Sequence, residues 1–527
     1  MGPEHTQDPG PADPELPADP AGRRVSCDGE RATVRYVGPV PPTTGLWLGV
    51  EWDNPERGKH DGSHGGVKYF TCRHPKGGSF VRPGKASFGV DFLTAFRQTY
   101  EFNTEEVLSE KITISSKKLK WFGVKERRFE NLPSVVLNCQ EVNGPGAPGE
   151  IRKTTPNVQW LDLSGSLLSS WEEVSTITEQ LEKLRGLQLS NNRLRLPSDP
   201  WAHCQAFSNL KVLALNGCML TWLQVLECAA MCPQLEDLFL EKNNITELQR
   251  PEGGVLQKLK CLNLSCNPLV QNCILNLSAL PRLKELNLSD TGLSAIRFED
   301  AAPGCYTAMF PALKVLNVDQ NIISEWCVVN ELAKLPCLMK LSCRGNRLVS
   351  SDQNPKTANQ MLIAKLEHLV VLNNSEITSE ERRGSELDYI KMFGEEWLKA
   401  GGPGQPSTQF INQHPRYQKL IDKYGAPDKG ELKKPEPFAL KNQLLKITFV
   451  FPDDVGRKPI EKKLPASMVI QKVKGLLYRL LKVPAGDLRL TYTSSKMEGT
   501  EFELNNDLKT LQFYSIEDED KVLVRWS

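Results

Sequence analysis

A regular spacing of leucines dominates the middle of the chain. The pattern L-x-x-L-x-L-x-x-N recurs, for example from Leu184 to Asn192 and from Leu235 to Asn243. The second leucine of successive copies falls at positions 161, 187, 213, 238, 262, 286, 316 and 341, so the copies lie 24 to 30 residues apart. Repeats of this length predict a solenoid, in which each copy adds one short strand to a shared core. We expect each asparagine to close the turn after its strand by bonding to neighbouring backbone.

The spacing is that of leucine-rich repeats, and it also predicts the two ends of the solenoid. Residues 132–142 fit the pattern one step before Leu161 and form a degenerate first repeat, with 103–131 as a cap. A last partial repeat starts at His368, and Thr378 followed by Glu381 is a capping-box signal for a helix. We therefore expect an α/β leucine-rich-repeat domain over 103–400, capped at both ends because an open end would expose the core.

The final segment has a different pattern. Apolar strands are indicated at 444–451, 488–492 and 521–526, a return strand begins at 461, and helical apolar spacing runs from Val469 to Leu480. The order β-β-α-β-β predicts an α+β ubiquitin-like grasp over 442–527. The chain as given ends without Gly-Gly, so we expect a docking module rather than a conjugated modifier. The Gly- and Pro-containing stretch 401–441 is interpreted as a linker with a short helix inside it.

The N-terminal region is polar and proline-rich over 1–20, which we expect to be disordered. A compact, glycine-rich domain of strands and turns is predicted over 24–96. Residues 21–100 carry twelve Lys and Arg against seven Asp and Glu, so this domain suits an acidic partner. Within it, a lysine stands between glycines with aromatic residues nearby. Such a slot fits a peptide that bears carboxylates and ends in an aromatic or apolar side chain.

The residues of that slot resemble a CAP-Gly domain, a small β-barrel-like fold. The family's loop Gly-Lys-Asn-Asp-Gly appears here as residues 58–62, preceded by Gly-x-Trp-x-Gly-Val at 45–50 and followed by Tyr-Phe-x-Cys at 69–72. The resemblance implies an apolar cavity, and loop side chains and amides that hold the carboxylates of a Glu-Glu-Tyr or Glu-Glu-Phe tail. The expected tail-binding residues are Trp47, Trp52, Gly58, Lys59, His60, Asp61, Gly62, Phe70 and Arg82.

His60 stands where the family has asparagine. A neutral histidine can still donate one hydrogen bond, whereas a protonated one would add a second positive charge and make tail binding sensitive to pH. The alternative for the aromatic residues of this domain is a purely structural role in its core.

The length of 527 residues and the composition agree with several domains. No stretch approaches 18 apolar residues and no signal peptide is evident, so we expect a cytoplasmic protein, associated with the cytoskeleton, whose fourteen cysteines are reduced. The net charge of +1 gives no indication of nucleic acid as a partner. The phosphate-loop, nucleophile-elbow and His-Glu-x-x-His motifs are missing, and the cysteine spacing does not suggest zinc. We expect no enzyme activity, cofactor or metal.

Together, the three domains of this multidomain chain resemble the tubulin-folding cofactor E family. The resemblance implies a chaperone that binds the acidic tail and body of α-tubulin, assists assembly of αβ heterodimers and dissociates them with other tubulin-folding cofactors. The ubiquitin-like domain would contact those cofactors or proteasome subunits, or another part of this chain. The alternatives are a microtubule-associated adaptor and a ubiquitin-like shuttle that delivers tubulin to the proteasome. The chain has no heptad run, which argues against the adaptor.

The concave face of the repeats is the expected second contact surface. Residues between the strand leucines point to this face, which suits a folded or nearly folded subunit better than a small molecule. The alternative is that they are ordinary solvated strand residues. The candidates are Asp237, Phe239, Glu241, Asn263, Glu285 and Asn287.

Overall fold

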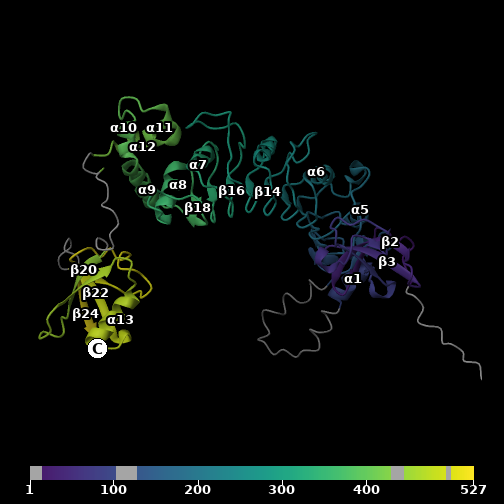
Figure 1. The fold of residues 1–527 in the computed structure, drawn as a ribbon, viewed down its shortest axis with the longest axis horizontal. Helices are drawn as coiled ribbons and strands as arrows, with labels where there is room; N and C mark the ends of the chain where they lie inside the picture. The colour runs from purple at the N-terminus through teal and green to yellow at the C-terminus, as the bar shows by residue number, and fades with distance from the viewer. Residues whose placement is uncertain (1–14, 102–127, 429–431, 433–443, 494–499, 527) are drawn as a thin grey trace, which may run out of the picture. The chain divides into compact units, whose positions relative to one another are not determined.

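The computed structural model describes residues 15–101, 128–428, 432, 444–493 and 500–526 (Figure 1). These residues divide into two compact units, Met1–Asp428 and Lys429–Ser527. Most of the predicted disordered tail (1–20) and most of the predicted N-terminal cap (103–131) lie outside the described residues. Within the described part of the chain, no helix combines the length and apolar character needed to cross a membrane.

The N-terminal domain is built on a four-stranded antiparallel sheet in the order β1-β2-β3-β6. Its apolar core contains Val25, Val34 and Val50 from three adjacent strands. The strands are β1 (Arg24–Cys27), β2 (Glu30–Pro39), β3 (Leu46–Trp52) and β6 (Gly78–Val81), with the small pair β4 (Ser63–His64) and β5 (Val67–Lys68) and the 3-10 turns η1 (Pro55–Arg57) and η2 (Pro83–Lys85).

This domain ends earlier than the sequence suggested. Strand β7 (Val90–Asp91) pairs in parallel with β9 (Val142–Gly144), and helix α1 (Phe92–Tyr100) buries Phe92 and Phe96 in the core of the repeats. The predicted boundary at 96 is therefore wrong, because residues 90–100 pack on the solenoid. They cover its N-terminal end, where we had expected only 103–131.

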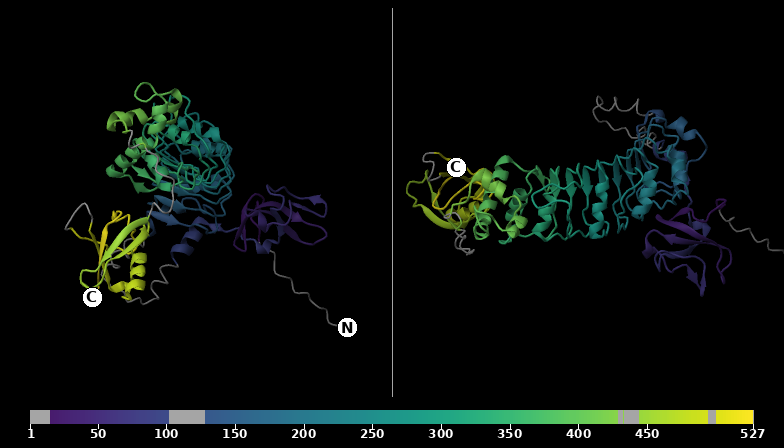
Figure 2. Two further views of the ribbon diagram at one scale, coloured as in Figure 1. Left: turned by 60° about the vertical axis from the view of Figure 1, so that its left-hand side comes forward. Right: turned by 90° about the horizontal axis from the view of Figure 1, so that it is seen from above.

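The repeats form one eleven-stranded sheet, which Figure 2 shows as a row of short strands. Ten strands are parallel and in register, so that the predicted leucines stack directly on one another, as Leu161 does on Leu187. The strands are β8 (Ser134–Val136), β10 (Trp160–Asp162), β11 (Gly186–Gln188), β12 (Val212–Ala214), β13 (Asp237–Phe239), β14 (Cys261–Asn263), β15 (Glu285–Asn287), β16 (Val315–Asn317), β17 (Lys340–Ser342), β18 (Val371–Leu372) and the antiparallel β19 (Ser375–Glu376). The degenerate first repeat and the last partial repeat are confirmed as β8 and β18.

The turn chemistry that recurs along the repeats is also as predicted. The Nδ2 group of Asn192 donates to the carbonyls of Leu163 and Leu189 at 3.0 and 2.9 Å, and its Oδ1 accepts from the Ser166 amide at 3.0 Å. In the two copies that lack asparagine, the Cys218 thiol and the Thr291 hydroxyl donate to the equivalent carbonyls. These side-chain bonds satisfy backbone groups that would otherwise be buried without a partner at the turns.

Helices and 3-10 turns cover the other side of the sheet and its C-terminal end (Figure 1). Within the repeats these are η3 (Phe129–Asn131), α4 (Glu150–Thr154), α5 (Trp171–Thr178), η4 (Pro200–His203), α6 (Trp222–Ala230), η5 (Gln271–Ala279), α7 (Trp326–Leu332) and α8 (Pro355–Lys365). The C-terminal cap comprises α9 (Ser379–Met392), α10 (Gly394–Lys399), α11 (Thr408–Gln413) and α12 (Tyr417–Tyr424). The Thr378 hydroxyl accepts from the Glu381 amide at 3.1 Å, as the capping signal predicts.

The predicted linker 401–441 is wrong over its first part. Phe410, Tyr417 and Leu420 are buried against Tyr389 and Trp397, so α11 and α12 belong to the C-terminal cap. The polar, glycine-rich composition misled because each of these short helices contributes only one or two large apolar residues. Most of 429–441 lies outside the described residues.

The second unit has the predicted grasp topology. Its five-stranded sheet has the order β21-β20-β24-β22-β23, in which β20 and β24 are parallel. Helix α13 buries Ile470, Val473 and Leu477 against this sheet. The elements are β20 (Leu444–Val450), β21 (Ile460–Pro465), α13 (Ile470–Leu481), η7 (Ala485–Asp487), β22 (Leu488–Thr493), β23 (Phe502–Glu503) and β24 (Lys521–Trp526).

All fourteen cysteines are free thiols. Burial raises the pKa of the Cys218 thiol to about 11, which keeps it protonated at neutral pH. Among the described residues, no group of three or more His, Cys, Asp and Glu side chains is placed to hold a metal ion.

Candidate peptide-binding site

The glycine-rich loop 58–62 is held by backbone contacts with the segment that leads into β6. The Lys59 and His60 amides both donate to the Gly78 carbonyl, at 2.7 and 3.1 Å, and the Gly78 amide donates to the His60 carbonyl at 2.7 Å. A Cβ atom on Gly58 would lie 1.9 Å from the Lys76 carbonyl oxygen. The close approach of these two backbone segments therefore requires glycine at position 58.

Gly62 is required for a second reason. Its φ of +98° is in the region that favours glycine, and an added Cβ would lie 2.0 Å from the Phe70 carbonyl oxygen. The Gly62 amide donates to His60 Nδ1 at 3.1 Å, and the Ser63 amide donates to Asp61 Oδ1 at 3.0 Å. Hydrogen bonds from Ser63 lower the pKa of Asp61, so its carboxylate is ionised at neutral pH and braces the loop.

These bonds correct one expectation. The amides of Lys59, His60 and Gly62 are used within the domain, so they are not available to hold the carboxylates of a tail. The groups of the loop that remain for a ligand are the Asp61 amide and the side chains. The Lys59 side chain is exposed, whereas His60 and Asp61 are half-buried.

Aromatic rings form a cluster beside the loop. The half-buried Phe80 ring is central: its centroid lies 4.9 Å from that of His60, 5.4 Å from Tyr69, 5.6 Å from Phe70 and 6.4 Å from Tyr36. We call these five residues, Tyr36, His60, Tyr69, Phe70 and Phe80, the aromatic cluster. Phe70 is buried and forms its floor, and the others are half-buried.

Sequence reasoning did not select Tyr36, Tyr69 and Phe80 as site residues. Tyr69 and Phe80 belong to the glycine-rich motifs, and that neighbourhood was the available signal. Tyr36 lies on β2, outside the motifs, and reaches the cluster because Tyr36 pairs with Gly49 across a bulge. A Cβ on Gly49 would lie 2.5 Å from the Phe70 ring, so the glycine makes room for the floor of the cluster.

Three expected site residues have other surroundings. Trp52 is 6% exposed and packs in the core of the domain. The Arg82 guanidinium lies 3.8 Å from the centroid of the Trp47 ring and donates to the Thr44 carbonyl at 2.8 Å, while Trp47 Nε1 donates to the Thr43 hydroxyl. Trp47 and Arg82 thus brace the turn before β3. The ring contacts among the described residues do not join Trp47 to the aromatic cluster.

His60 is electrically neutral at physiological pH. Burial lowers its pKa below the ordinary 6.5, with His64 and Lys59 acting in the same direction and Asp61 opposing them. Because Nδ1 accepts a hydrogen bond from Gly62, the neutral ring carries its proton on Nε2. His60 can therefore donate one hydrogen bond to a carboxylate. The expected second positive charge is not favoured.

The structure brings the repeat-face candidates together on three adjacent strands. Asp237 and Glu285 flank Cys261 in one row, and Phe239, Asn263 and Asn287 form the next row. The side-chain oxygens of Asn263 and Asn287 accept from the Ser265 and Ser289 amides, each at 2.9 Å, so part of their hydrogen-bonding capacity is structural.

The acidic members of this face repel one another. Burial raises the pKa of Asp237, and the negative charges of Glu236 and Glu285 raise it further. The Glu241 amide, just beyond β13, donates to Asn216 Oδ1 at 2.8 Å. The half-buried Phe239 stands among these polar groups, so the six candidates form one mixed apolar and acidic surface.

Comparisons with known proteins agree with this architecture. A family model described as "CAP-Gly domain" matches residues 21–86, and one described as "Ubiquitin-like domain" matches residues 448–525. The first match ends before β7, as the packing of residues 90–100 requires.

Two curated relatives match almost the whole chain. The protein named tubulin-specific chaperone E from Danio rerio is 60% identical over 515 residues, which cover 96% of this chain and 99% of that protein. Its Homo sapiens counterpart is 51% identical over 525 residues, covering 97% and 99%. A solved structure of the C-terminal ubiquitin-like domain of mouse tubulin-specific chaperone E is 58% identical and covers 16% of this chain and 88% of that one, with a TM-score of 0.16.

Proposed function

The chain belongs to the tubulin-specific chaperone E family, and on that premise we propose that it is a tubulin-folding chaperone whose CAP-Gly domain holds the acidic C-terminal tail of α-tubulin. The observation that carries the proposal is the exposed Lys59 beside the half-buried aromatic cluster. A cation next to aromatic rings suits a peptide that ends in a carboxylate and an aromatic side chain, and Glu-Glu-Tyr has both.

We assign a role to each residue of the site within this proposal. Lys59 supplies the positive charge, and Nε2 of His60 supplies one hydrogen bond. The rings of Phe80, Tyr69 and Tyr36 receive the terminal side chain of the tail. Gly58, Gly62 and Asp61 hold the loop in shape, while Phe70 forms the floor.

We propose further that the repeat face binds the body of α-tubulin, and that binding energy alone assembles and, with other tubulin-folding cofactors, dissociates heterodimers. A chaperone can shift the dimer equilibrium only by as much as its affinities for the free and the dimeric subunit differ. The broad face of ten parallel strands offers far more contact area than the loop does. In this scheme the tail is a tether and no reaction is catalysed by the chain itself.

The ubiquitin-like domain is proposed as a docking module, with proteasome subunits or another cofactor as its partner. Deletion of residues 442–527 separates this role from that of a shuttle. A chaperone that lacks the domain should still bind tubulin and act on dimers, whereas a shuttle should lose its function and keep tubulin binding.

A pull-down experiment tests the tail site. Wild-type protein and the variant Lys59→Ala are each offered α-tubulin with and without its last tyrosine. We expect strong capture only for wild type with the complete tail. Lys59→Ala removes the positive charge of the site, and loss of the tyrosine removes the aromatic side chain that the cluster receives. Equal capture in all four combinations would eliminate the tail site.

A further inference from the structure

A basic groove lies between the CAP-Gly domain and the first repeats. It has a volume of about 680 Å³, and both domains line it. The CAP-Gly side contributes Arg35, Glu51, Asp53 and Arg73, and the repeat side contributes Arg193 and Arg195.

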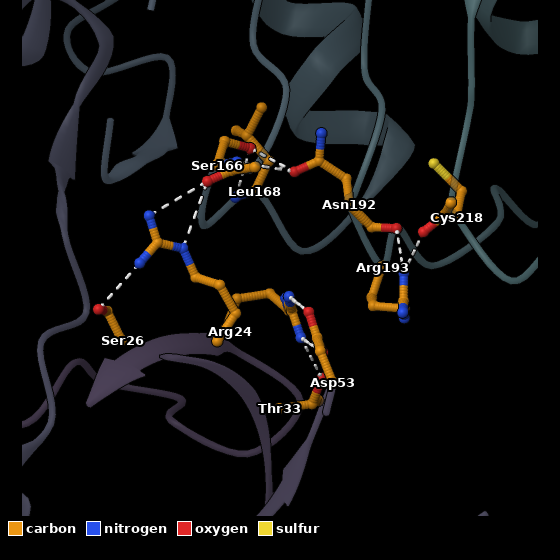
Figure 3. Close-up of polar contacts among 12 residues, drawn as sticks. Arg24, Ser26, Thr33, Asp53, Ser166, Leu168, Asn192, Arg193 and Cys218 are labelled. Atoms are coloured by element: carbon orange, nitrogen blue, oxygen red, sulfur yellow. Dashed lines mark hydrogen bonds and ion pairs between the residues drawn. The ribbon is translucent and has the colours of Figure 1, made fainter. Parts of the chain in front are cut away.

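The two domains are bound to each other next to this groove. The Arg31 guanidinium donates to the carbonyls of Gly165 and Cys139 at 3.1 to 3.3 Å, and the Ser87 hydroxyl donates to Glu141 at 2.5 Å. Figure 3 shows the CAP-Gly strands that carry Arg24 and Asp53 on one side and the turns of the repeats that carry Ser166 and Asn192 on the other. The groove therefore has two walls that are fixed by hydrogen bonds.

The carboxylates of the groove are already paired. Asp53 accepts two hydrogen bonds from Arg24, at 2.6 and 2.5 Å, and the Arg24 side chain is 1% exposed (Figure 3). Glu51 forms an ion pair with Arg35 at 2.8 Å, and it also accepts from the Arg73 amide at 2.7 Å. Both carboxylates are thus engaged by arginines, although the charge of Asp53 also acts on Arg193.

Three arginines of the groove have no such partner. Among the described residues, no carboxylate oxygen lies within 4.0 Å of the guanidinium groups of Arg73, Arg193 or Arg195. The half-buried Arg193 donates only to backbone carbonyls, that of Gly217 at 2.6 Å and that of Asn192 at 3.3 Å (Figure 3). Burial lowers the pKa of Arg193, yet the group remains charged at neutral pH. The groove thus carries an excess of positive charge, although the charges of Asp53 and Glu173 act on Arg193 and Arg195.

The groove adjoins the proposed tail site. The glycine loop packs against Lys76 and Gly78. The same short segment contributes Arg73, His74 and Gly77 to the lining of the groove. A peptide that leaves the aromatic cluster along this segment would therefore run toward the groove.

We propose that this groove binds the acidic stretch of the same tail that precedes its last residues. The inference rests on the proposed function of the CAP-Gly site and extends it: the cluster receives the end of the tail, and Arg73, Arg193 and Arg195 receive glutamates upstream. Arginine forms paired hydrogen bonds with carboxylates, and the fixed walls reduce the cost of ordering the site.

The test measures binding of two synthetic peptides to the full chain by fluorescence anisotropy. The short probe is acetyl-Glu-Glu-Tyr, and the long probe has eight further glutamates before that end. Wild type should bind the long probe about tenfold more tightly than the short one, with an advantage that falls as salt rises. A third probe, with glutamines in place of the eight upstream glutamates, should bind no more tightly than the short probe.

Substitutions test whether the tighter binding of the long probe depends on the groove. The double variant Arg73→Gln/Arg195→Gln changes two exposed side chains and should reduce the long-probe advantage to about twofold or less, with short-probe affinity unchanged. Arg193→Gln should act in the same direction. The matched control Lys284→Gln/Lys314→Gln removes two exposed charges from a distant part of the repeats and should change neither affinity.

The outcomes separate this inference from the function on which it rests. Suppose that Lys59→Ala abolishes binding of the short probe, but wild type binds the short probe and the long glutamate probe equally. The groove inference is then wrong and the tail site stands. If the double variant still binds the long probe about tenfold more tightly than the short probe, the inference is also wrong. If wild type binds neither probe, the proposed tail site itself fails.

Discussion

At the scale of single residues, His60 shows how a substitution within a motif is accommodated. Its Nδ1 accepts from the Gly62 amide, and its ring packs against Phe80. An asparagine oxygen in the same place could accept the same bond, so the loop shape does not depend on an imidazole. What the histidine adds is ring contact with the cluster.

We predict that tail binding is insensitive to pH between about 6.5 and 8. Burial lowers the pKa of His60 below 6.5, so the neutral form of the ring predominates over this range. Titration of a fluorescent Glu-Glu-Tyr peptide at several pH values measures this, with His60→Asn as the control that cannot titrate. An affinity that rises severalfold toward pH 6.5 in wild type alone would show that His60 is charged in the site.

Gly58→Ala should destabilise the CAP-Gly domain by about 1–3 kcal/mol and abolish tail binding. The new Cβ would lie 1.9 Å from the backbone oxygen of Lys76, which cannot move without breaking the pairing of Gly78 with the loop. Gly84→Ala is the matched control, because a Cβ there meets no atom within 4 Å. Chemical denaturation and peptide titration measure the two effects. Unchanged stability and binding in Gly58→Ala would refute the packing argument.

At the scale of elements, α1 shows which features of the fold the sequence predicted and which it did not. The repeat strands were predictable because each leucine that points into the core recurs at a fixed spacing. The apolar Phe92 and Phe96 were equally evident, but nothing in the local pattern says which of two adjacent cores they enter. For the same reason α11 and α12 resembled a linker: their stability comes from contacts with Tyr389 and Trp397, which lie elsewhere in the sequence.

The site was predictable to a similar degree. The glycines and Lys59 were evident because a short motif contains them. Trp52 lies in the core, whereas Phe80 belongs to the aromatic cluster. This difference depends on the side of its strand on which each ring lies. Tyr36 joins the cluster across a β-bulge, and sequence alone did not indicate that bulge.

Phe96→Ala should destabilise the repeats rather than the CAP-Gly domain. Removing a large buried ring costs about 3–5 kcal/mol, and this ring lies in the repeat core. Hydrogen exchange of the full chain should show faster exchange in β8 and β10 with β1 to β3 unchanged. Faster exchange confined to β1 to β3 would show that residues 90–100 pack with the CAP-Gly domain instead.

The C-terminal cap should lose stability in acid through Glu386. Burial alone would raise the pKa of this carboxyl, but hydrogen bonds from Tyr424, Lys423 and Arg416 lower it to about 2. A carboxylate with a lowered pKa stabilises the fold above its unfolded value near 4.5, and this stabilisation is lost as pH falls from there toward 2.

Glu386→Gln should therefore cost about 3 kcal/mol at pH 7, because it removes the shared anionic partner of the partly buried Arg382 and Arg416 and of Lys423. The difference from wild type should shrink as pH falls below 4.5. The exposed Glu376 of β19 gives the control Glu376→Gln, which should match wild type. Denaturant unfolding of the cap at pH 7 and pH 3 measures both. A difference that is the same at the two pH values would exclude the ionised carboxylate as its cause.

At the scale of the whole molecule, the CAP-Gly domain and the repeats are joined rather than flexibly tethered. The β7–β9 pairing, α1 and Arg31 connect them within one compact unit. A tail held by the loop is therefore held at a fixed place relative to the repeat sheet. Under the proposed function, this arrangement would let a local tail contact direct the much larger repeat surface toward the body of the same subunit.

The most direct test of this account is the yield of intact αβ-tubulin dimers after incubation with the purified chain and the other tubulin-folding cofactors in the absence of added nucleotide. Analytical size exclusion follows the dimer as the chain is titrated. We predict that dimer is lost in proportion to the wild-type protein added, and that Lys59→Ala requires severalfold more protein for the same loss. Unchanged dimer levels at saturating wild-type protein would contradict the account.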